Sequence, residues 1–281
     1  MKNQGFPYTM RLMLELKLST PFKNAPVFYK PETESTMIDA RNLAGQGFPT
    51  GTLVVAGYQT TGRGRFPERK WESPPDESLL CTLILRTSDL PQPIEPIPLK
   101  AGLAVARMIE QEFGLNPTIK WPNDVFLGER KVGGILSELK EGVCLVGIGI
   151  NCLQKSFPKE MRKSATSLRK VTGKRFEPKE LIPSLLQELY RWFFNSVHED
   201  SNTEDSWKTE VEKRLYLRNK TIGFQPGIPG KEEPIAGTLL GISEEGLLLL
   251  QPEGSADVVE FAAGEILPPS RYFPPSNSIK K

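Results

Sequence analysis

The sequence predicts an α+β fold in which helices flank a mixed, mainly antiparallel sheet, followed by a small all-β domain. Strand-like runs between residues 118 and 151 are separated by turns too short for crossover helices. Segments with helical spacing surround them, and beyond residue 220 only strands and turns recur. We therefore expect an N-terminal extension (1–26), a large domain (27–216) and a C-terminal domain (217–281).

The expected elements follow from apolar patterning along the chain. Short continuous apolar runs predict buried strands at residues 27–29, 53–56, 79–86, 118–121, 125–127, 132–139 and 143–151. Apolar residues at helical spacing predict helices at residues 36–44, 99–113, 178–192 and 202–215. Alternation and turn residues predict the strands of the small domain at residues 235–242, 246–251 and 258–261.

The residues between these elements support the same order. Thr36 and Asp39 have the spacing of a capping box, so the first helix begins there, and Gly45 ends it. Four prolines between residues 87 and 98 predict a loop ahead of the second helix. Residues 1–25 are poorly patterned, and we expect them to lie over the surface.

Composition places the chain among ordinary globular proteins. Its 281 residues are 38% hydrophobic and 25% charged, which is sufficient for a full core. No apolar run reaches the ~18 residues of a membrane span, and charges interrupt the N-terminal apolar stretch. The net charge of +2 comes without the basic stripe of a DNA-binding protein. We therefore expect a cytoplasmic protein that binds neither membrane nor DNA.

The cysteines and the histidine indicate no metal or disulfide chemistry. Cys81, Cys144 and Cys152 each lie in an apolar run, without the paired spacing of a zinc site, and we expect buried free thiols. His198 is the only histidine, and a solvated helix end is its expected place. No dedicated metal site is predicted.

Two segments offer cations for an anionic ligand. The first is GYQTTGRGR at residues 57–65, where glycines permit close backbone approach and two arginines present planar donor forks. The second is KWPND at residues 120–124, where Lys120 ends a strand beside polar residues. For the first, the alternative is a basic surface turn. For the second, Asp124 pairs with Lys120 or with Arg130 as ordinary structure.

Two further segments carry glycines inside predicted strands. Gly133 and Gly134 are adjacent in one strand, whereas Gly147 and Gly149 alternate in the next. Glycine weakens a strand, so a closely approaching neighbour usually explains it. We expect a bound ligand or a tightly packed helix against these positions. Because Gly147 and Gly149 alternate, one face of the second strand carries no side chains there, which indicates a cavity or a tight helix contact.

Taken together, these segments resemble the biotin protein ligases. The resemblance is carried by EST at 34–36, YQTTGRGR at 58–65, KW at 70–71, KWPND at 120–124, KVGGILSE at 131–138 and GIGIN at 147–151. It covers roughly residues 27–155 strongly and the rest as a general layout. It implies a class II synthetase-like catalytic domain and an SH3-like C-terminal β barrel.

The resemblance also implies a reaction. The biotin carboxylate attacks the α-phosphate of Mg-ATP, which gives biotinyl-5'-AMP and pyrophosphate, and a carrier lysine then takes the biotin and releases AMP. The implied catalytic residues are Lys120, which offsets charge at the reacting centre, and Arg63, whose loop covers the intermediate and excludes water. Mg²⁺ is expected to sit on ATP oxygens and water.

The implied binding residues fall into two groups. For biotin they are Ser35, Thr36, Met37, Gln59, Gly62, Arg63, Gly64, Arg65, Lys120, Gly133 and Gly134. For ATP they are Arg63, Arg65, Trp71, Lys120, Asn123, Lys131 and Asn151. Two features depart from the family pattern. Met37 replaces a frequent Asn, and residues 66–69 (FPER) replace a shorter Gly/Arg-rich segment. We expect the latter to alter loop closure and retention of the adenylate.

The implied partner is the biotin carboxyl carrier protein of acetyl-CoA carboxylase or of a related carboxylase. Some family members carry a winged helix-turn-helix before the catalytic domain, but only 26 residues precede Val27, so we expect no operator binding. Strand edges leave pairing with a carrier, or a homodimer, open. The alternatives are a lipoate or octanoate ligase, a nucleic-acid-binding module, and an inactive biotin sensor. The arginine loop with KWPND favours biotin, and Lys120 with Arg63 favours activity.

Overall fold

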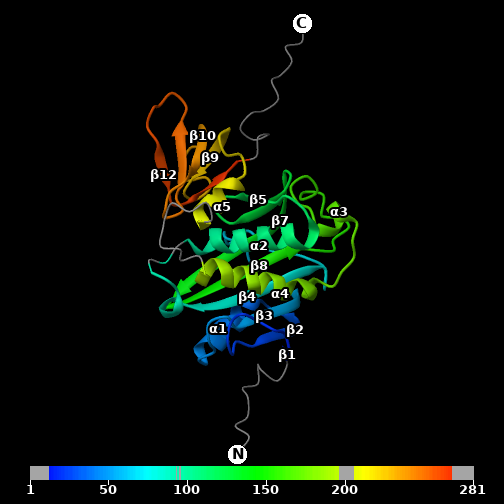
Figure 1. The fold of residues 1–281 in the computed structure, drawn as a ribbon. Coiled ribbons are helices and arrows are strands. Elements are labelled where there is room, and N and C mark those ends of the chain that lie inside the picture. The colour runs from blue at the N-terminus through cyan, green and yellow to red at the C-terminus, as the bar shows by residue number, and fades with distance from the viewer. Residues whose placement is uncertain (1–12, 93, 95, 196–205, 268–281) are drawn as a thin grey trace, which may run out of the picture.

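The chain builds two β-sheets, and helices flank the larger one (Figure 1). The computed structural model describes residues 13–92, 94, 96–195 and 206–267. The larger sheet has eight strands in the order β1-β2-β3-β4-β8-β7-β6-β5, and the smaller has five in the order β12-β11-β10-β9-β13. The smaller sheet is formed by the C-terminal part of the chain.

The larger sheet is mixed and mainly antiparallel. Its strands are β1 (Leu14–Leu16), β2 (Val27–Thr33), β3 (Leu53–Gln59), β4 (Ser78–Arg86), β5 (Thr118–Lys120), β6 (Asp124–Leu127), β7 (Arg130–Lys140) and β8 (Val143–Asn151). Among the strands of the described residues, only β2 and β3 pair in parallel, and a helix connects them, as is usual for a parallel crossover. The hairpins predicted between residues 118 and 151 are present. The predicted fold class is therefore confirmed.

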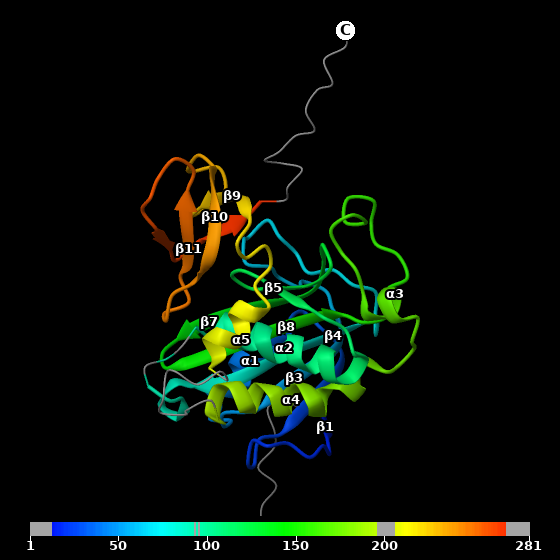
Figure 2. The ribbon, with the colours of Figure 1, turned by 45° about the horizontal axis from the view of Figure 1, so that its top comes forward.

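Helices cover the two faces of this sheet unequally. They are α1 (Thr36–Gly45), α2 (Ile97–Phe113), α3 (Leu168–Thr172), α4 (Ile182–Tyr190) and α5 (Trp207–Lys213). Figure 2 shows α2 and α4 side by side along one face, where they bury the main core. The short α1 covers only part of the other face, over Val54 and Ile84. The remainder of that second face is free to form a site.

The smaller sheet packs against the β5–β6 end of the larger one. Its strands are β9 (Thr221–Pro226), β10 (Ile235–Ile242), β11 (Leu248–Pro252), β12 (Val259–Phe261) and β13 (Gly264–Ile266). The buried Trp121 side chain joins the two sheets, because its Nε1 donates to the carbonyl oxygen of Gly246 at 3.0 Å and its ring contacts Phe224. This contact brings β13 beside the KWPND segment.

The start of α1 differs from the prediction. Ser35, not Thr36, is the N-cap, and its hydroxyl accepts a hydrogen bond from the backbone N–H of Met37 at 3.3 Å. Asp39 does not complete a capping box. Its carboxylate accepts a hydrogen bond from Thr33 at 2.6 Å and pairs with Lys30 at 3.0 Å. The ammonium group of Lys30 is a stronger partner for this carboxylate than a backbone amide.

Several other elements were misplaced or missed. Residues 14–16 form the edge strand β1 on β2, so the expectation of an unpatterned surface segment is wrong there. The short α3, β9 and β13 were not predicted. The segment expected as one helix over 178–192 begins as a 3₁₀ turn (Pro178–Leu181) and ends as a π turn (Arg191–Asn195). His198 and residues 202–205 lie outside the described residues.

Candidate active site

A cavity of about 450 Å³ opens on the face of the larger sheet that α1 leaves uncovered. This volume is typical of small-ligand sites, which span roughly 300–1,000 Å³. Most of the predicted site residues line it: Ser35, Thr36, Met37, Gln59, Arg63, Gly64, Arg65, Trp71, Lys120, Asn123, Lys131 and Gly134. Residues not predicted to bind a ligand also line it, among them Arg69, Lys70, Leu80, Cys81, Asp124, Met161 and Glu265. Gly147 and Gly149, which were predicted to leave one face of their strand open, line it as well.

Glycines of β7 and β8 line one wall of this cavity and leave it free of side chains. A Cβ at Gly147 would lie 2.9 Å from Met37 Sδ, and one at Gly149 would lie 2.7 Å from Trp71 Cε2. A Cβ at Gly134 would lie 3.2 Å from Trp71 Cζ3. The prediction of closely approaching neighbours is therefore confirmed. These neighbours are the side chains of Met37 and Trp71, and at Gly134 also that of Lys131, whose Cε lies 2.9 Å from the added Cβ.

Gly133 lies on the opposite face of β7 and does not line the cavity. Its nearest side chain outside the β-ladder is Val105 of α2, 3.7 Å from a Cβ placed on Gly133. Successive residues of a strand face opposite sides, and here Gly134 faces the cavity while Gly133 faces α2. The expectation that Gly133 contacts biotin is not supported by this placement, and Gly133 serves packing of the helix instead.

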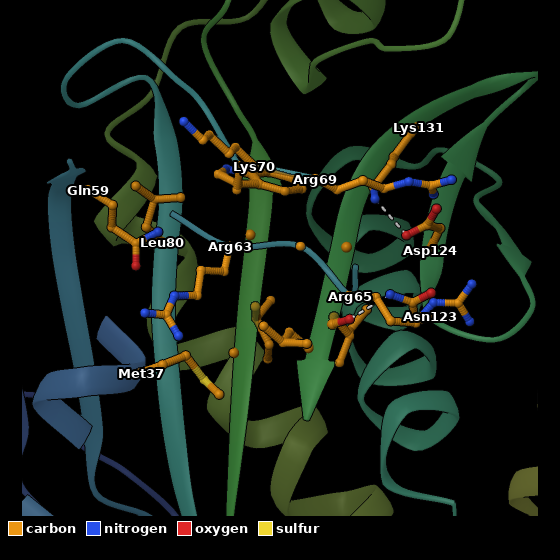
Figure 3. Close-up of a pocket in the computed structure, with 18 of the residues that line it drawn as sticks. Met37, Gln59, Arg63, Arg65, Arg69, Lys70, Leu80, Asn123, Asp124 and Lys131 are labelled. Atoms are coloured by element: carbon orange, nitrogen blue, oxygen red, sulfur yellow. Dashed lines mark hydrogen bonds and ion pairs between the residues drawn. The ribbon is translucent and has the colours of Figure 1, made fainter. Parts of the chain in front are cut away.

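Apart from Arg63, uncharged residues line one end of the cavity. Figure 3 shows Met37, Gln59 and Leu80 at this end, with the side chain of Arg63 directed toward them. Gln59 Oε1 accepts hydrogen bonds from the backbone N–H of Thr36 at 2.8 Å and from its hydroxyl at 3.0 Å. We call this end, lined by Ser35, Thr36, Met37, Gln59 and Leu80, the neutral end.

The other end is charged. Asn123, Asp124, Lys131 and Arg65 gather there in Figure 3. Arg69 and Glu265 line the cavity beside them, and we call these six residues the charged end. Lys131 Nζ lies 2.6 Å from Asp124 Oδ1, so Asp124 pairs with Lys131 and not with Lys120 or Arg130 as considered from the sequence. The β6–β7 bulge after Val125 sets the register that places Lys131 opposite this strand.

Lys120 lies at the end of β5 and reaches the same cavity. Burial lowers the pKa of its ammonium group, and Asp124 and Glu265 oppose this shift with their charges. Its Nζ lies 5.4 Å from the centre of the Phe126 ring, and within the described residues it makes no ion pair. The cavity therefore contains a poorly solvated cation that a ligand anion can neutralise.

The arginine loop folds into a short hairpin over residues 62–71. Its rungs are the hydrogen bonds from Trp71 N to Gly62 O at 3.1 Å and from Gly64 N to Arg69 O at 2.8 Å. A Cβ at Gly62 would lie 2.3 Å from the Trp71 carbonyl oxygen, so this position requires glycine. Gly62 lines an adjoining groove rather than the cavity itself.

The turn of this hairpin is the segment that departs from the family pattern. Two guanidinium groups lie near the centre of the Phe66 ring, that of Arg65 at 4.5 Å and that of Arg69 at 5.0 Å. Arg69 is hydrogen-bonded to Glu265 of β13 at 2.6 Å, and Arg65 donates to the Gly264 carbonyl oxygen at 2.8 Å. The smaller sheet thus holds the hairpin over the cavity.

Glu265 is the residue of the smaller sheet that lines the cavity, and it was not predicted from the sequence. Burial raises the pKa of its carboxyl, but the hydrogen bond from Arg69 and the charges of Arg69, Lys120 and Arg65 lower it overall. Burial lowers the pKa of Arg65, whereas the hydrogen bond to Glu265 raises that of Arg69. No local motif marks Glu265, because its partners lie about 200 residues earlier in the chain.

Of the two asparagines expected to bind ATP, only Asn123 lines the cavity. Its Nδ2 donates to the Ile135 carbonyl oxygen at 2.7 Å. Asn151 is buried outside the cavity lining and donates to the Thr166 carbonyl oxygen at 3.1 Å. The structure therefore gives Asn151 a role in anchoring the segment that follows β8, and a direct contact with ATP is not supported.

A wider groove adjoins the cavity on the other side of the hairpin. Trp71, Ser73, Phe157 and Gln154 line it. Three buried polar atoms along it have no hydrogen-bond partner among the described residues: Trp71 Nε1, Ser73 Oγ and Gln154 Oε1. Buried polar atoms are normally paired, so these three identify the groove as a place for a ligand or ordered water.

Other features bear on the class of protein. The three cysteines are free and buried, as predicted, and burial raises the pKa of Cys81 and Cys152 to about 12. In the described ranges, no three His, Cys, Asp or Glu side chains come together as a metal site. Across the same residues, no helix combines the length and apolarity that a membrane crossing requires.

Comparisons with known proteins agree with this architecture. The model of the Biotin/lipoate A/B protein ligase family matches residues 29–154. The Bifunctional ligase/repressor BirA of Bacillus spizizenii is 33% identical over 84% of this chain and 72% of its own length. The Biotin--[acetyl-CoA-carboxylase] ligase of Mycobacterium tuberculosis is 28% identical over 84% of this chain and 86% of its own.

A solved structure extends the likeness to the fold. The biotin protein ligase from Aquifex aeolicus, in complex with biotin and ATP, is 31% identical with a TM-score of 0.72. The match covers 88% of this chain and 98% of that one, so it includes both sheets.

Proposed function

Because this chain belongs to the biotin protein ligase family, we propose that it is an ATP-dependent ligase that biotinylates a carrier protein. In the first step, a carboxylate oxygen of biotin attacks the α-phosphorus of ATP, which forms biotinyl-5'-AMP and expels pyrophosphate. In the second, the ε-amine of a carrier lysine attacks the anhydride carbonyl. An amide bond forms, AMP leaves, and the amine gives up a proton.

The observation that carries this proposal is the cavity that joins a neutral end to a charged end, with Lys120 in its lining. Two anions must meet for the first step, and their mutual repulsion opposes the reaction. Lys120 is partly desolvated before any ligand arrives, so its charge acts without reorganisation of water. Lys120 would offset the negative charge on the biotin carboxylate and on the α-phosphate. The loop that carries Arg63 would cover both groups and exclude water.

We place the biotin ring at the neutral end and the nucleotide at the charged end. Ser35, Thr36 and Gln59 supply polar atoms for the ring, while Met37 and Leu80 supply an apolar wall. Lys131 and the loop arginines face the phosphates. Trp71 borders both the cavity and the groove, so its ring is the surface that we propose for adenine, with Nε1 free to donate.

Mg²⁺ is proposed to arrive on the nucleotide. The two carboxylates that line the charged end, Asp124 and Glu265, are paired with Lys131 and Arg69. They therefore do not form a ready-made acidic cluster, and ATP oxygens with water would hold the ion. Bound there, Mg²⁺ would neutralise part of the triphosphate charge. Lys131 and the arginines would orient the remaining oxygens.

The proposal extends to the protein substrate, the cellular compartment and the division of the chain into domains. We propose the carrier domain of an acetyl-CoA carboxylase or a related carboxylase as the protein substrate, without DNA binding. The cytoplasm is the proposed location, because free buried thiols suit a reducing compartment. We retain residues 27–216 as the catalytic domain and 217–281 as the C-terminal domain, which contributes Glu265 to the cavity.

One assay tests the function directly. The purified protein is incubated with ATP, Mg²⁺, labelled biotin and a carrier domain, and label on the carrier is measured with and without ATP. ATP-dependent labelling is expected. Absence of transfer by the wild-type protein, when a known biotin ligase labels the same carrier, would contradict the proposal.

A second measurement separates biotin from the lipoate alternative. Biotin is expected to raise the midpoint of thermal unfolding, because a ligand that binds only the folded state stabilises it. Lipoate at the same concentration is expected to leave the midpoint unchanged. The opposite pattern would favour a lipoate ligase.

A further inference from the structure

Behind the neutral end of the cavity, a chain of hydroxyl groups links strand β4 to the Gln59 side chain. Thr82, whose exposed fraction is 0%, donates from Oγ1 to Thr36 Oγ1 at 2.8 Å. Thr36 Oγ1 in turn donates to Gln59 Oε1 at 3.0 Å. Thr82 does not line the cavity, so any effect it has on a ligand passes through the other two residues.

The donor and acceptor roles in this series of hydrogen bonds are set by the backbone N–H of Thr36, which can only donate. The backbone N–H of Thr36 points at a Gln59 side-chain atom 2.8 Å away, so that atom must be the oxygen of the amide. The single hydroxyl hydrogen of Thr36 is given to the same oxygen. The bond between Thr36 and Thr82 is therefore one in which Thr82 donates. The NH₂ group of Gln59 is left to face the cavity.

The surroundings of Thr82 keep this arrangement in place. In the sheet, Thr82 is paired with Val54 of β3 and with Gly147 of β8. The apolar residues Met37, Ile84 and Leu145 form the cluster on this face, so water does not compete for the hydroxyl groups. Within the described residues, Gln59 Nε2 has no hydrogen-bond partner, and Gln59 lines the cavity.

We propose that Thr82 is a positioning residue that holds the Gln59 amide with its NH₂ group toward the ligand ring, and so selects a ring bearing an acceptor there. The inference rests on the proposed function, under which that acceptor is the urea carbonyl oxygen of biotin. A flipped amide would set its NH₂ group against the backbone N–H of Thr36, which can only donate. It would also meet the Thr36 hydroxyl hydrogen, which the hydrogen bond from Thr82 keeps turned toward Gln59. A ring presenting an N–H at this point would leave the Gln59 donor unpaired.

The first experiment replaces the hydroxyl of Thr82 with a methyl group of similar size. Thr82→Val is compared with Thr82→Ser, which keeps the hydroxyl, and with Thr52→Val. Thr52 is an equally buried threonine, but its Oγ1 has no hydrogen-bond partner in the described part of the chain. Should Thr82→Val prove too unstable to purify, Thr82→Ala gives the same comparison. The KM values for biotin and for ATP are measured by ATP–pyrophosphate exchange.

A selective effect on biotin is expected. Thr82→Val should raise the KM for biotin about tenfold, the worth of one hydrogen bond in such a network, and leave the KM for ATP within about twofold. Thr82→Ser and Thr52→Val should match the wild type. Equal KM values for Thr82→Val and Thr52→Val, or a parallel rise for both substrates, would overturn the inference.

The second experiment tests the donor itself with 2-iminobiotin, whose cation carries N–H donors in place of the urea oxygen. The ratio of the Kd values for biotin and 2-iminobiotin is measured by calorimetry. Gln59→Glu, which offers an acceptor, should shift this ratio at least about tenfold toward 2-iminobiotin. Thr82→Val should shift it in the same direction by less. An unchanged ratio in both variants would overturn the inference.

The two hypotheses fail differently. If the wild-type protein does not adenylate biotin, the proposed function is wrong. If it does, and the variant pairs above behave alike, only the role of Thr82 is wrong.

Discussion

The two ends of the cavity are built on different physical principles. At the neutral end, a continuous chain of hydrogen bonds from Thr82 through Thr36 presets the Gln59 amide. At the charged end, cations are held by carboxylates that a ligand phosphate can replace, as in the Lys131–Asp124 pair. The hydrogen-bond network of the neutral end selects ligands, because a ligand that leaves one of its polar groups unpaired binds poorly. The ion pairs of the charged end can open to a ligand phosphate, and their cations then stabilise the charge that develops in the reaction. We expect substitutions at the charged end to change rates and nucleotide binding, and those at the neutral end to change biotin selectivity.

The largest effect is expected at Lys120. Lys120→Ala removes the buried cation and should slow formation of the adenylate by about 10²–10³-fold, the usual cost of one preorganised electrostatic group. The KM for biotin should change far less. Single-turnover formation of biotinyl-5'-AMP measures the rate. A loss confined to biotin affinity would contradict the division between the two ends.

The same residue predicts a pH dependence. Because burial lowers the pKa of Lys120, its ammonium group loses the proton at a lower pH than an ordinary lysine. The rate of adenylate formation should therefore be full below this pKa and fall up to about tenfold per pH unit above it. Lys120→Arg, whose guanidinium stays charged, should lose this alkaline decline at a lower overall rate. An identical decline in both proteins would assign it to another group.

An intermediate effect is expected at the cavity wall that the glycines of β7 and β8 line. In Gly149→Ala the new Cβ would lie 2.7 Å from Trp71 Cε2, so the ring must shift. The KM for ATP should rise about tenfold, as expected for one lost aromatic stacking contact, with little change for biotin. Gly45→Ala is the matched control, because a Cβ there meets nothing within 4 Å. A rise in the KM for biotin alone would place the nucleotide elsewhere.

The smallest effect is expected where the smaller sheet holds the hairpin. Glu265→Gln keeps the shape but removes the charge that pairs with Arg69. Partly exposed pairs contribute about 0.2–1 kcal/mol, so dissociation of biotinyl-5'-AMP should accelerate only about 2–5-fold. Glu244→Gln, which removes an exposed partner of Lys208 away from the cavity, should have no effect. Equal dissociation rates in both variants would mean that Glu265 does not retain the hairpin.

Much of the site could be predicted because its signals are local. Glycines at alternate positions of β8, Lys120 at a strand end and two arginines between glycines are visible within a few residues. The misplacements are of another kind. Gly133 and Gly134 are neighbours in sequence, yet only Gly134 lines the cavity. Asp39 has capping-box spacing, yet it pairs with Lys30, because a nearby charge outcompeted the helix terminus.

By itself, the sequence determined the α+β class, most strands and helices, the bared face of β8 and the buried thiols. Each of these depends on local periodicity or on residue type. Only the tertiary structure decided that Glu265 closes the charged end, that Asp124 belongs to Lys131, and that Thr82 stands behind Gln59. These pairings depend on strand register and on contacts between segments far apart in the chain. No local sequence pattern encodes these pairings. A carboxylate or a hydroxyl can pair with many side chains, and only the register of the folded sheet decides which of them lies within hydrogen-bonding distance.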